Sequence, residues 1–150
     1  MSTRDTFGPG ITWLAVKSDA PERVAEGAGV RDLRRAPWSQ GVDAAYATSG
    51  EEPSCLVTPP VDGWVLVASV RLPHLRGEGE MQALLERVSA WARGAEVQAF
   101  ASLPMADYQA WARAVEGRVT RSFYWCGAED QAREQGDRTP EEAALDLPPS

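Results

Sequence analysis

Nucleophilic catalysis needs a nucleophile beside a base, and the chain offers one histidine for that base, His74. Two cysteines, Cys55 and Cys126, are the thiols that could be placed beside it. His74 lies in a Pro-His-Leu-Arg-Gly segment with no Gly-x-Ser-x-Gly elbow near it. We therefore favour a solvent-exposed loop histidine. An enzyme with a site around His74 is the alternative.

Paired carboxylates could carry out acid–base chemistry, and Glu51-Glu52 and Glu141-Glu142 are adjacent pairs. Such chemistry needs two carboxylates in different surroundings, one of them with a raised pKa. Adjacent glutamates in polar segments favour two solvated side chains instead. Glu142 also completes a capping box with Thr139, which gives it a structural role. We expect no catalytic residues and a protein that is not an enzyme.

Metal and cofactor sites are not expected either. Two cysteines and one histidine cannot supply the usual ligands of a structural zinc site, and the glycine spacings match no phosphate-binding motif. The cysteines are expected to be free, buried thiols. No apolar stretch approaches the length that spans a bilayer, and the N-terminus lacks an apolar leader. These features predict no membrane association and a cytoplasmic location.

The formal net charge is −7, and it is concentrated near the C-terminus. Residues 127–150 contain seven acidic residues against two arginines, a net charge of −5, so the preceding residues carry −2. Binding to nucleic acid depends largely on cationic side chains, so no nucleic-acid partner is expected. A basic protein partner is compatible with this charge, because the acidic surface would accelerate its approach.

The chain has six tryptophans, a residue favoured both in cores and at interface hot spots. Trp64, Trp91 and Trp111 fall on predicted core faces. Trp38 lies within residues 30–58, where no clear periodicity is present. It is therefore the best candidate for an exposed anchor.

Charged residues near Trp38 complete the expected interaction site. Arg34 and Arg35 precede it and Glu51 and Glu52 follow it within the same irregular region. A protein-binding module explains this combination of an aromatic anchor and flanking charge. We expect the partner-binding residues to be Trp38, Arg34, Arg35, Glu51 and Glu52.

Segments rich in β-branched and aromatic residues predict strands over 11–16, 64–70 and 119–126. Residues 64–70 are apolar on both faces, which predicts a central strand covered on both sides. Residues 97–100 form a shorter strand candidate.

A continuous apolar stripe predicts the main helix over 81–92, and Gly94 is placed to terminate it. A second amphipathic helix is expected from near Pro104 to Gly117, with Trp111 on its buried side. These two helices would cover a sheet.

Two short helices are expected near the ends of the chain. Asp19 would cap the first, which Gly27 limits, and Thr139 would cap the second. The fold class is therefore α+β, a mixed or antiparallel sheet with two main amphipathic helices packed on it. Residues 1–126 would form the single domain, and 127–150 an acidic extension that contains the capped helix.

Several segments, including residues 61–68, 96–100, 108–114 and 117–123, resemble a set of small bacterial proteins of uncharacterised function. The shared features are apolar strands, tryptophans and caps, so this resemblance implies a fold and no reaction. By type, the chain also resembles the immunity proteins of bacterial toxin systems. That resemblance implies a protein that binds a cognate toxin, often a basic domain, and neutralises it. A structural or accessory subunit of a larger assembly is a further alternative.

Overall fold

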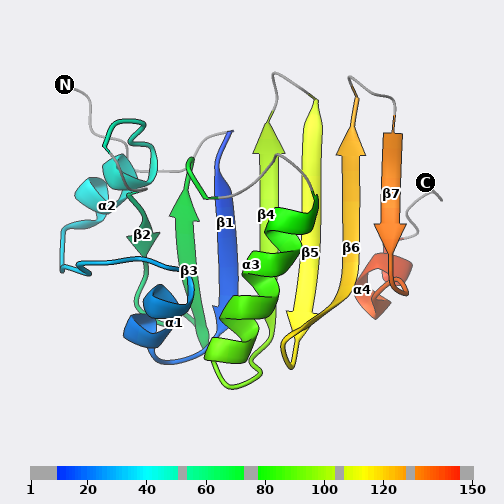
Figure 1. Cartoon of the computed structure of the whole chain (residues 1–150), viewed down its shortest axis with the longest axis horizontal. Helices are drawn as coiled ribbons and strands as arrows, with labels where there is room; N and C mark the ends of the chain where they lie inside the picture. Colours follow the sequence, from blue (N-terminus) through cyan, green and yellow to red (C-terminus); the bar gives the residue numbers. More distant parts are fainter. Residues whose placement is uncertain (1–9, 51–53, 73–77, 104–106, 128–130, 146–150) are drawn as a thin grey trace.

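The computed structural model describes residues 10–50, 54–72, 78–103, 107–127 and 131–145. Within these ranges the chain forms a seven-stranded antiparallel sheet and four helices (Figure 1). The strands are β1 (Thr12–Lys17), β2 (Leu56–Val57), β3 (Trp64–Ser69), β4 (Val97–Leu103), β5 (Tyr108–Val115), β6 (Arg118–Cys126) and β7 (Gln131–Gln135). The helices are α1 (Pro21–Gly27), α2 (Trp38–Ala45), α3 (Glu78–Trp91) and α4 (Pro140–Ala144).

The strand order is β2-β3-β1-β4-β5-β6-β7, and every neighbouring pair is antiparallel. The last four strands form a meander, and β1 lies between β3 and β4. Glu116 and Gly117, with φ of 54° and 77°, form the turn between β5 and β6. Two consecutive positive φ values are typical of the type I′ turn that matches strand twist. The expected α+β class with a sheet is confirmed.

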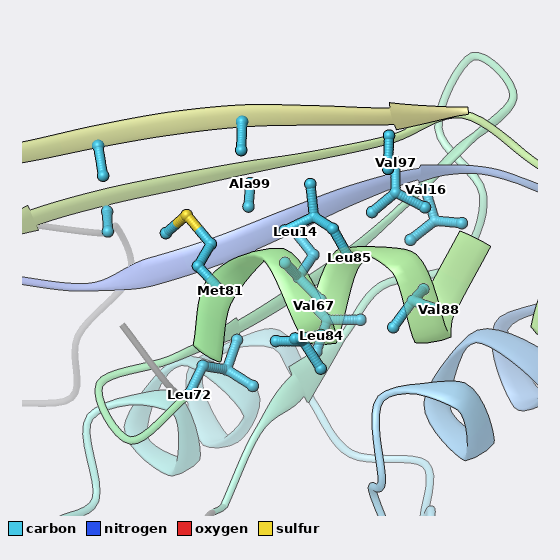
Figure 2. Close-up of a cluster of buried hydrophobic side chains, with 14 of the residues drawn as sticks. Leu14, Val16, Val67, Leu72, Met81, Leu84, Leu85, Val88, Val97 and Ala99 are labelled. Atoms are coloured by element: carbon cyan, nitrogen blue, oxygen red, sulfur yellow. The ribbon is translucent and has the colours of Figure 1, made fainter. Parts of the chain in front are cut away.

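One face of the sheet is covered by α3, with α1 beside it (Figures 1 and 2). The helix α3 contacts β4, β5 and β6. Its apolar stripe shares one buried cluster with alternate residues of β1, β3 and β4, because side chains one apart on a strand point to opposite faces. Burial of these residues forms the main core. Its central members are Leu14, Val16, Val67, Met81, Leu84, Leu85, Val88, Val97 and Ala99.

Among the described residues, the opposite face is covered at its two ends, by α4 at β6 and β7, where Arg121 binds Glu142, and by α2 near β2 and β3. There Ala45 of α2 packs in a small buried cluster with Ala68 of β3 and Ile11. Trp64 and Leu66 on the same face of β3 are only half-buried. The expected strand is therefore present, but it lies next to an edge and is covered on both faces only in part.

The expected helix between Pro104 and Gly117 is wrong, because residues 108–115 form β5. The same residues satisfy a strand better: alanines on one face are buried under α3, and larger or polar side chains alternate with them. Pairing with both β4 and β6 stabilises the strand. Trp111 consequently points away from α3, and only one long helix packs on the sheet.

Two smaller expectations are also wrong. Ala20, not Asp19, is the N-cap residue of α1, and its N–H donates to Oγ of Ser18 at 3.1 Å. Trp91 at the end of α3 is 50% exposed and lies against Gly27 of α1, outside the main core. Residues 38–45, where no helix was expected, form α2.

The C-terminal capping box is confirmed. Thr139 Oγ1 accepts from the Glu142 N–H at 3.2 Å, and the Glu142 carboxylate accepts from the Thr139 N–H at 3.0 Å. The helix α4 that it opens lies at the end of β7 (Figure 1). Residues 131–135, within the segment described above as an acidic extension, add the edge strand β7 to the same sheet.

Candidate functional site

The face that α3 leaves uncovered carries a line of aromatic side chains. Trp13 of β1 pairs with Phe100 of β4, Phe100 pairs with Trp111 of β5, and Trp111 pairs with Phe123 of β6. Directly paired residues lie on the same face with Cβ atoms about 5 Å apart. These four residues, here called the aromatic row, therefore run across four neighbouring strands.

Three rings of the aromatic row, those of Trp13, Phe100 and Trp111, form two neighbouring pairs. Trp13 stacks on Phe100 with centroids 4.4 Å apart and planes inclined by 19°. Phe100 and Trp111 lie 6.5 Å apart at 38°. All four side chains are half-buried, so they retain surface available for binding. Ring pairs of this kind stabilise each other and limit ring motion.

A chain of polar contacts fixes Trp111. Its Nε1–H donates to Oε1 of Gln98 at 3.2 Å, and Nε2 of Gln98 donates to Oε2 of Glu96 at 3.0 Å. Nη2 of Arg113 donates to the other oxygen of Glu96 at 2.7 Å. This hydrogen bond holds the pKa of Glu96 below its ordinary value. The indole is thus oriented before any partner arrives, which lowers the entropy lost on binding.

A shallow cavity of about 380 Å³ opens over the aromatic row. Its volume lies at the lower end of the range for small-ligand sites, roughly 300 to 1,000 Å³. The lining joins the row to small and polar residues from β1, β4 and β5. These are Gly10, Ile11, Trp13, Phe100, Ala101, Ser102, Gln109, Ala110, Trp111 and Phe123.

A buried arginine lies at the other end of the face, where β6, β7 and α4 meet. Arg121 is 2% exposed. Its guanidinium donates to both oxygens of Glu142, at 3.0 and 2.7 Å, and to Glu134 at 2.6 Å. These contacts raise the pKa of Arg121 and hold that of Glu142 at about 2. The bidentate pair fixes α4 on the sheet.

Local backbone irregularities place Arg121. The pairing between β5 and β6 shifts register just before it, between the partners of Arg113 and Ala114. Such bulges re-aim side chains. Gly136, with φ of 79°, brings the turn after β7 so close that a Cβ there would collide with the carbonyl oxygen of Thr120. The turn therefore closes over the guanidinium, whose Nη1 donates to the Gly136 carbonyl at 3.3 Å.

None of the residues expected to bind a partner belongs to the aromatic row. Trp38 begins α2 and is 48% exposed, and Arg34 and Arg35 are exposed in the segment before it. Glu51 and Glu52 lie outside the described residues. The helix that Trp38 begins reaches the sheet face opposite α3, here called the open face, through Ala45, whose cluster includes Trp13.

The two thiols considered for catalysis lie far apart in the sheet. Cys55 precedes β2, which is five strand positions from β6, where Cys126 lies. At about 4.8 Å per strand this is roughly 24 Å. Burial raises the pKa of the Cys55 thiol, which disfavours the reactive thiolate. His74 lies outside the described residues.

The aromatic row was missed because Trp111 was assigned to a helix. The signal that could have found it is alternation: Gln109, Trp111 and Arg113 alternate with alanines, as in a strand with one buried face. The pairing that aligns the four rings connects residues about 90 positions apart, from Trp13 to Phe100. No local sequence pattern specifies that register.

In comparisons with known proteins, no family model, curated protein or solved structure matches the chain. None of the helices in the described ranges has the length and apolar character needed to cross a membrane. Across the same ranges, no three His, Cys, Asp or Glu side chains gather as a metal site.

Proposed function

We propose that this chain is a protein-binding module that acts by contact rather than catalysis. The observation that carries the proposal is the aromatic row, four half-buried rings aligned on an uncovered sheet face. Apolar surface of this kind on a soluble domain marks a partner site, and tryptophan is enriched among binding hot spots. The contacts that fix Trp111 prepare the surface for a rigid partner.

The most concrete form of the proposal is an immunity protein that neutralises a cognate bacterial toxin in the cytoplasm. The net charge of −7 supports a basic partner, because opposite charge accelerates encounter. If the toxin domain binds across the open face, this chain would cover a wide area of the toxin surface. An enzyme around His74 and an accessory subunit are the alternatives that the experiment must separate.

Trp38 extends the proposed surface. It begins α2 seven residues before Ala45, about 10 Å along the helix axis, and Ala45 belongs to the cluster that Trp13 joins. We therefore keep Trp38, with Arg34 and Arg35, as contacts flanking the aromatic row. Trp38→Ala should weaken partner binding and leave the melting temperature unchanged. A clear loss of thermal stability would instead assign Trp38 to internal packing.

The test begins with the tagged full-length chain, used to capture proteins from its native lysate at moderate salt. The captured protein is then purified and its complex measured by calorimetry. We expect one stoichiometric basic partner whose toxic activity is abolished in the complex. Trp13→Leu should weaken the complex at least tenfold, as hot-spot residues do.

The matched control is Trp91→Leu, since Trp91 is half exposed on α3, away from the open face. This variant should bind the partner as the wild type does. Phe123→Leu offers a second test of the aromatic row if Trp13→Leu unfolds. Equal binding by the row variants and the control would refute the proposed surface, and capture of no partner would direct attention to ligand and activity screens.

A further inference from the structure

The cavity over the aromatic row has a lining that suits a cation. No lining residue within the described ranges is ionisable: the polar members, Ser102 and Gln109, are neutral, and the rings of Trp13, Phe100 and Trp111 supply π faces. A cation within about 6 Å of such a face is attracted by the ring quadrupole, and tryptophan is the strongest ring in this role. The side-chain oxygens of Ser102 and Gln109 can accept hydrogen bonds from the same group.

The arginines of the open face do not oppose an incoming cation. Arg113 is paired with Glu96 at 2.7 Å, and Arg121 with both Glu134 and Glu142. Lys17 lies four residues beyond Trp13 along β1, about 13 Å away. The net charge of −7 makes the surrounding potential favourable to positive charge.

We propose that this cavity receives an arginine or lysine side chain of a basic partner protein, an inference that rests on the proposed binding function. Its charged group stacks on the rings, and its methylene stem contacts the apolar part of the lining, which includes Ile11. Arginine is the better occupant, because its planar guanidinium stacks on aromatic rings and donates hydrogen bonds in the same plane.

The experiment uses the full-length chain labelled with ¹⁵N and the indole N–H signals of its tryptophans. Three capped tripeptides are titrated: Gly-Arg-Gly, the same peptide with citrulline, and the same peptide with leucine. Citrulline keeps the shape of arginine without its charge. We expect the arginine peptide to shift the signals of Trp13 and Trp111 but not of Trp91, with citrulline binding about fivefold more weakly.

Other outcomes identify other occupants and overturn the inference. Equal affinity for arginine and citrulline would mean that charge is not recognised. Tighter binding of the leucine peptide would assign the cavity to an apolar anchor. Shifts of Trp13 and Trp111 with protein concentration alone would assign it to a second copy of the chain.

Variants test the ring requirement. Trp13→Leu keeps apolar bulk but removes a π face, so it should reduce arginine-peptide binding, whereas Trp91→Leu should not. Trp111→Phe keeps a ring and should retain most of the binding. The peptide comparison on the wild-type chain remains decisive if Trp13→Leu fails to fold.

The inference and the proposed function can fail separately. If Trp13→Leu loses the captured partner while arginine and citrulline peptides bind alike, the binding surface stands and the cation inference falls. If the arginine peptide binds selectively but capture of the partner is unchanged by Trp13→Leu, the cation cavity stands and the proposed protein-binding surface falls.

Discussion

For two buried threonines, we expect substitution by valine to change the free energy of unfolding in opposite directions. Thr12 is 1% exposed, and its Oγ1 has no hydrogen-bond partner among the described residues. Thr58 is also buried, but its Oγ1 accepts from the Leu66 N–H at 2.9 Å. An unpaired buried hydroxyl costs free energy, whereas removing one partner of a buried hydrogen bond leaves the other unsatisfied. Comparing the two sites therefore separates the free-energy cost of burying an unpaired hydroxyl from the stabilisation that a hydrogen-bonded hydroxyl provides.

Thr12→Val should raise the free energy of unfolding by about 1 kcal/mol, and Thr58→Val should lower it by about 1 kcal/mol. Valine has nearly the shape of threonine, so packing changes little in either variant. Urea denaturation at pH 7 measures both changes. A destabilised Thr12→Val protein would mean that the Thr12 hydroxyl has a partner in solution.

Arg121 makes stability depend on pH. Its guanidinium holds the pKa of Glu142 at about 2, below the ordinary value of 4.5. A carboxyl with a lowered folded-state pKa stabilises the fold above its unfolded pKa, and this contribution is lost as pH falls from about 4.5 towards 2. Arg121→Met should flatten the stability profile in that window, measured by urea denaturation at pH 2 to 7.

The same variant should lose about 3 kcal/mol at pH 7, because it leaves two carboxylates without their buried partner. Arg138→Met is the control. Arg138 lies 3.5 Å from Glu134 and is 31% exposed, so its loss should cost less than about 1 kcal/mol. An equal loss of free energy of unfolding in the two variants would show that burying the Arg121 ion pairs contributes no additional stability.

At the scale of elements, small residues of β5 set how closely α3 approaches the sheet. Ala112 and Ala114 are buried beneath it. Ala112→Leu should lower the free energy of unfolding by about 2 kcal/mol, because a larger side chain forces the helix outward. Ala132→Leu on the exposed part of β7 is the control and should change stability little. A tolerated Ala112→Leu would contradict close packing between α3 and β5.

Elements with local sequence signals were predictable. The main helix over 81–92 corresponds to α3, and the capping box at Thr139 is present. Both depend on residues within a few positions of each other, where periodicity and side-chain capping act directly. The strand over 11–16 was also predictable, because its β-branched and aromatic content suits a pleated surface.

The second helix was mispredicted for a physical reason. Residues 108–115 place apolar side chains at spacings that satisfy a helix and a strand alike, and alanine itself favours a helix. Pairing with β4 and β6 decided the outcome, and tertiary contacts of that kind override local propensity. The aromatic row follows from this pairing, so it could not be predicted while residue 111 was assigned to a helix.

At the scale of the whole molecule, the two faces of the sheet differ. One carries the main core under α3. In the part of the chain that the structure describes, the other is covered by α2 near β2 and β3 and by α4 at β6 and β7. The aromatic row occupies uncovered sheet beside that partial cover, with rings fixed by stacking and by the Gln98 contact. The proposed binding function rests on this difference between the two faces, because the aromatic rings on the second face keep part of their surface exposed.

For binding to a basic partner, net charge should affect the association rate, and the aromatic row should affect the dissociation rate. Asp137 and Glu141 are exposed near α4, and Asp137→Asn with Glu141→Gln would change the net charge from −7 to −5. We expect this double variant to associate severalfold more slowly at low salt, with an unchanged dissociation rate, because long-range charge steers encounter.

The difference should vanish near 0.5 M salt, where screening removes steering at distances beyond a few ångströms. Trp13→Leu should do the reverse, raising the dissociation rate while leaving association and its salt dependence unchanged. Stopped-flow mixing with the purified partner measures both rates. A faster dissociation in the double variant would place Asp137 or Glu141 in direct contact with the partner, and the acidic end of the sheet would then belong to the interface itself.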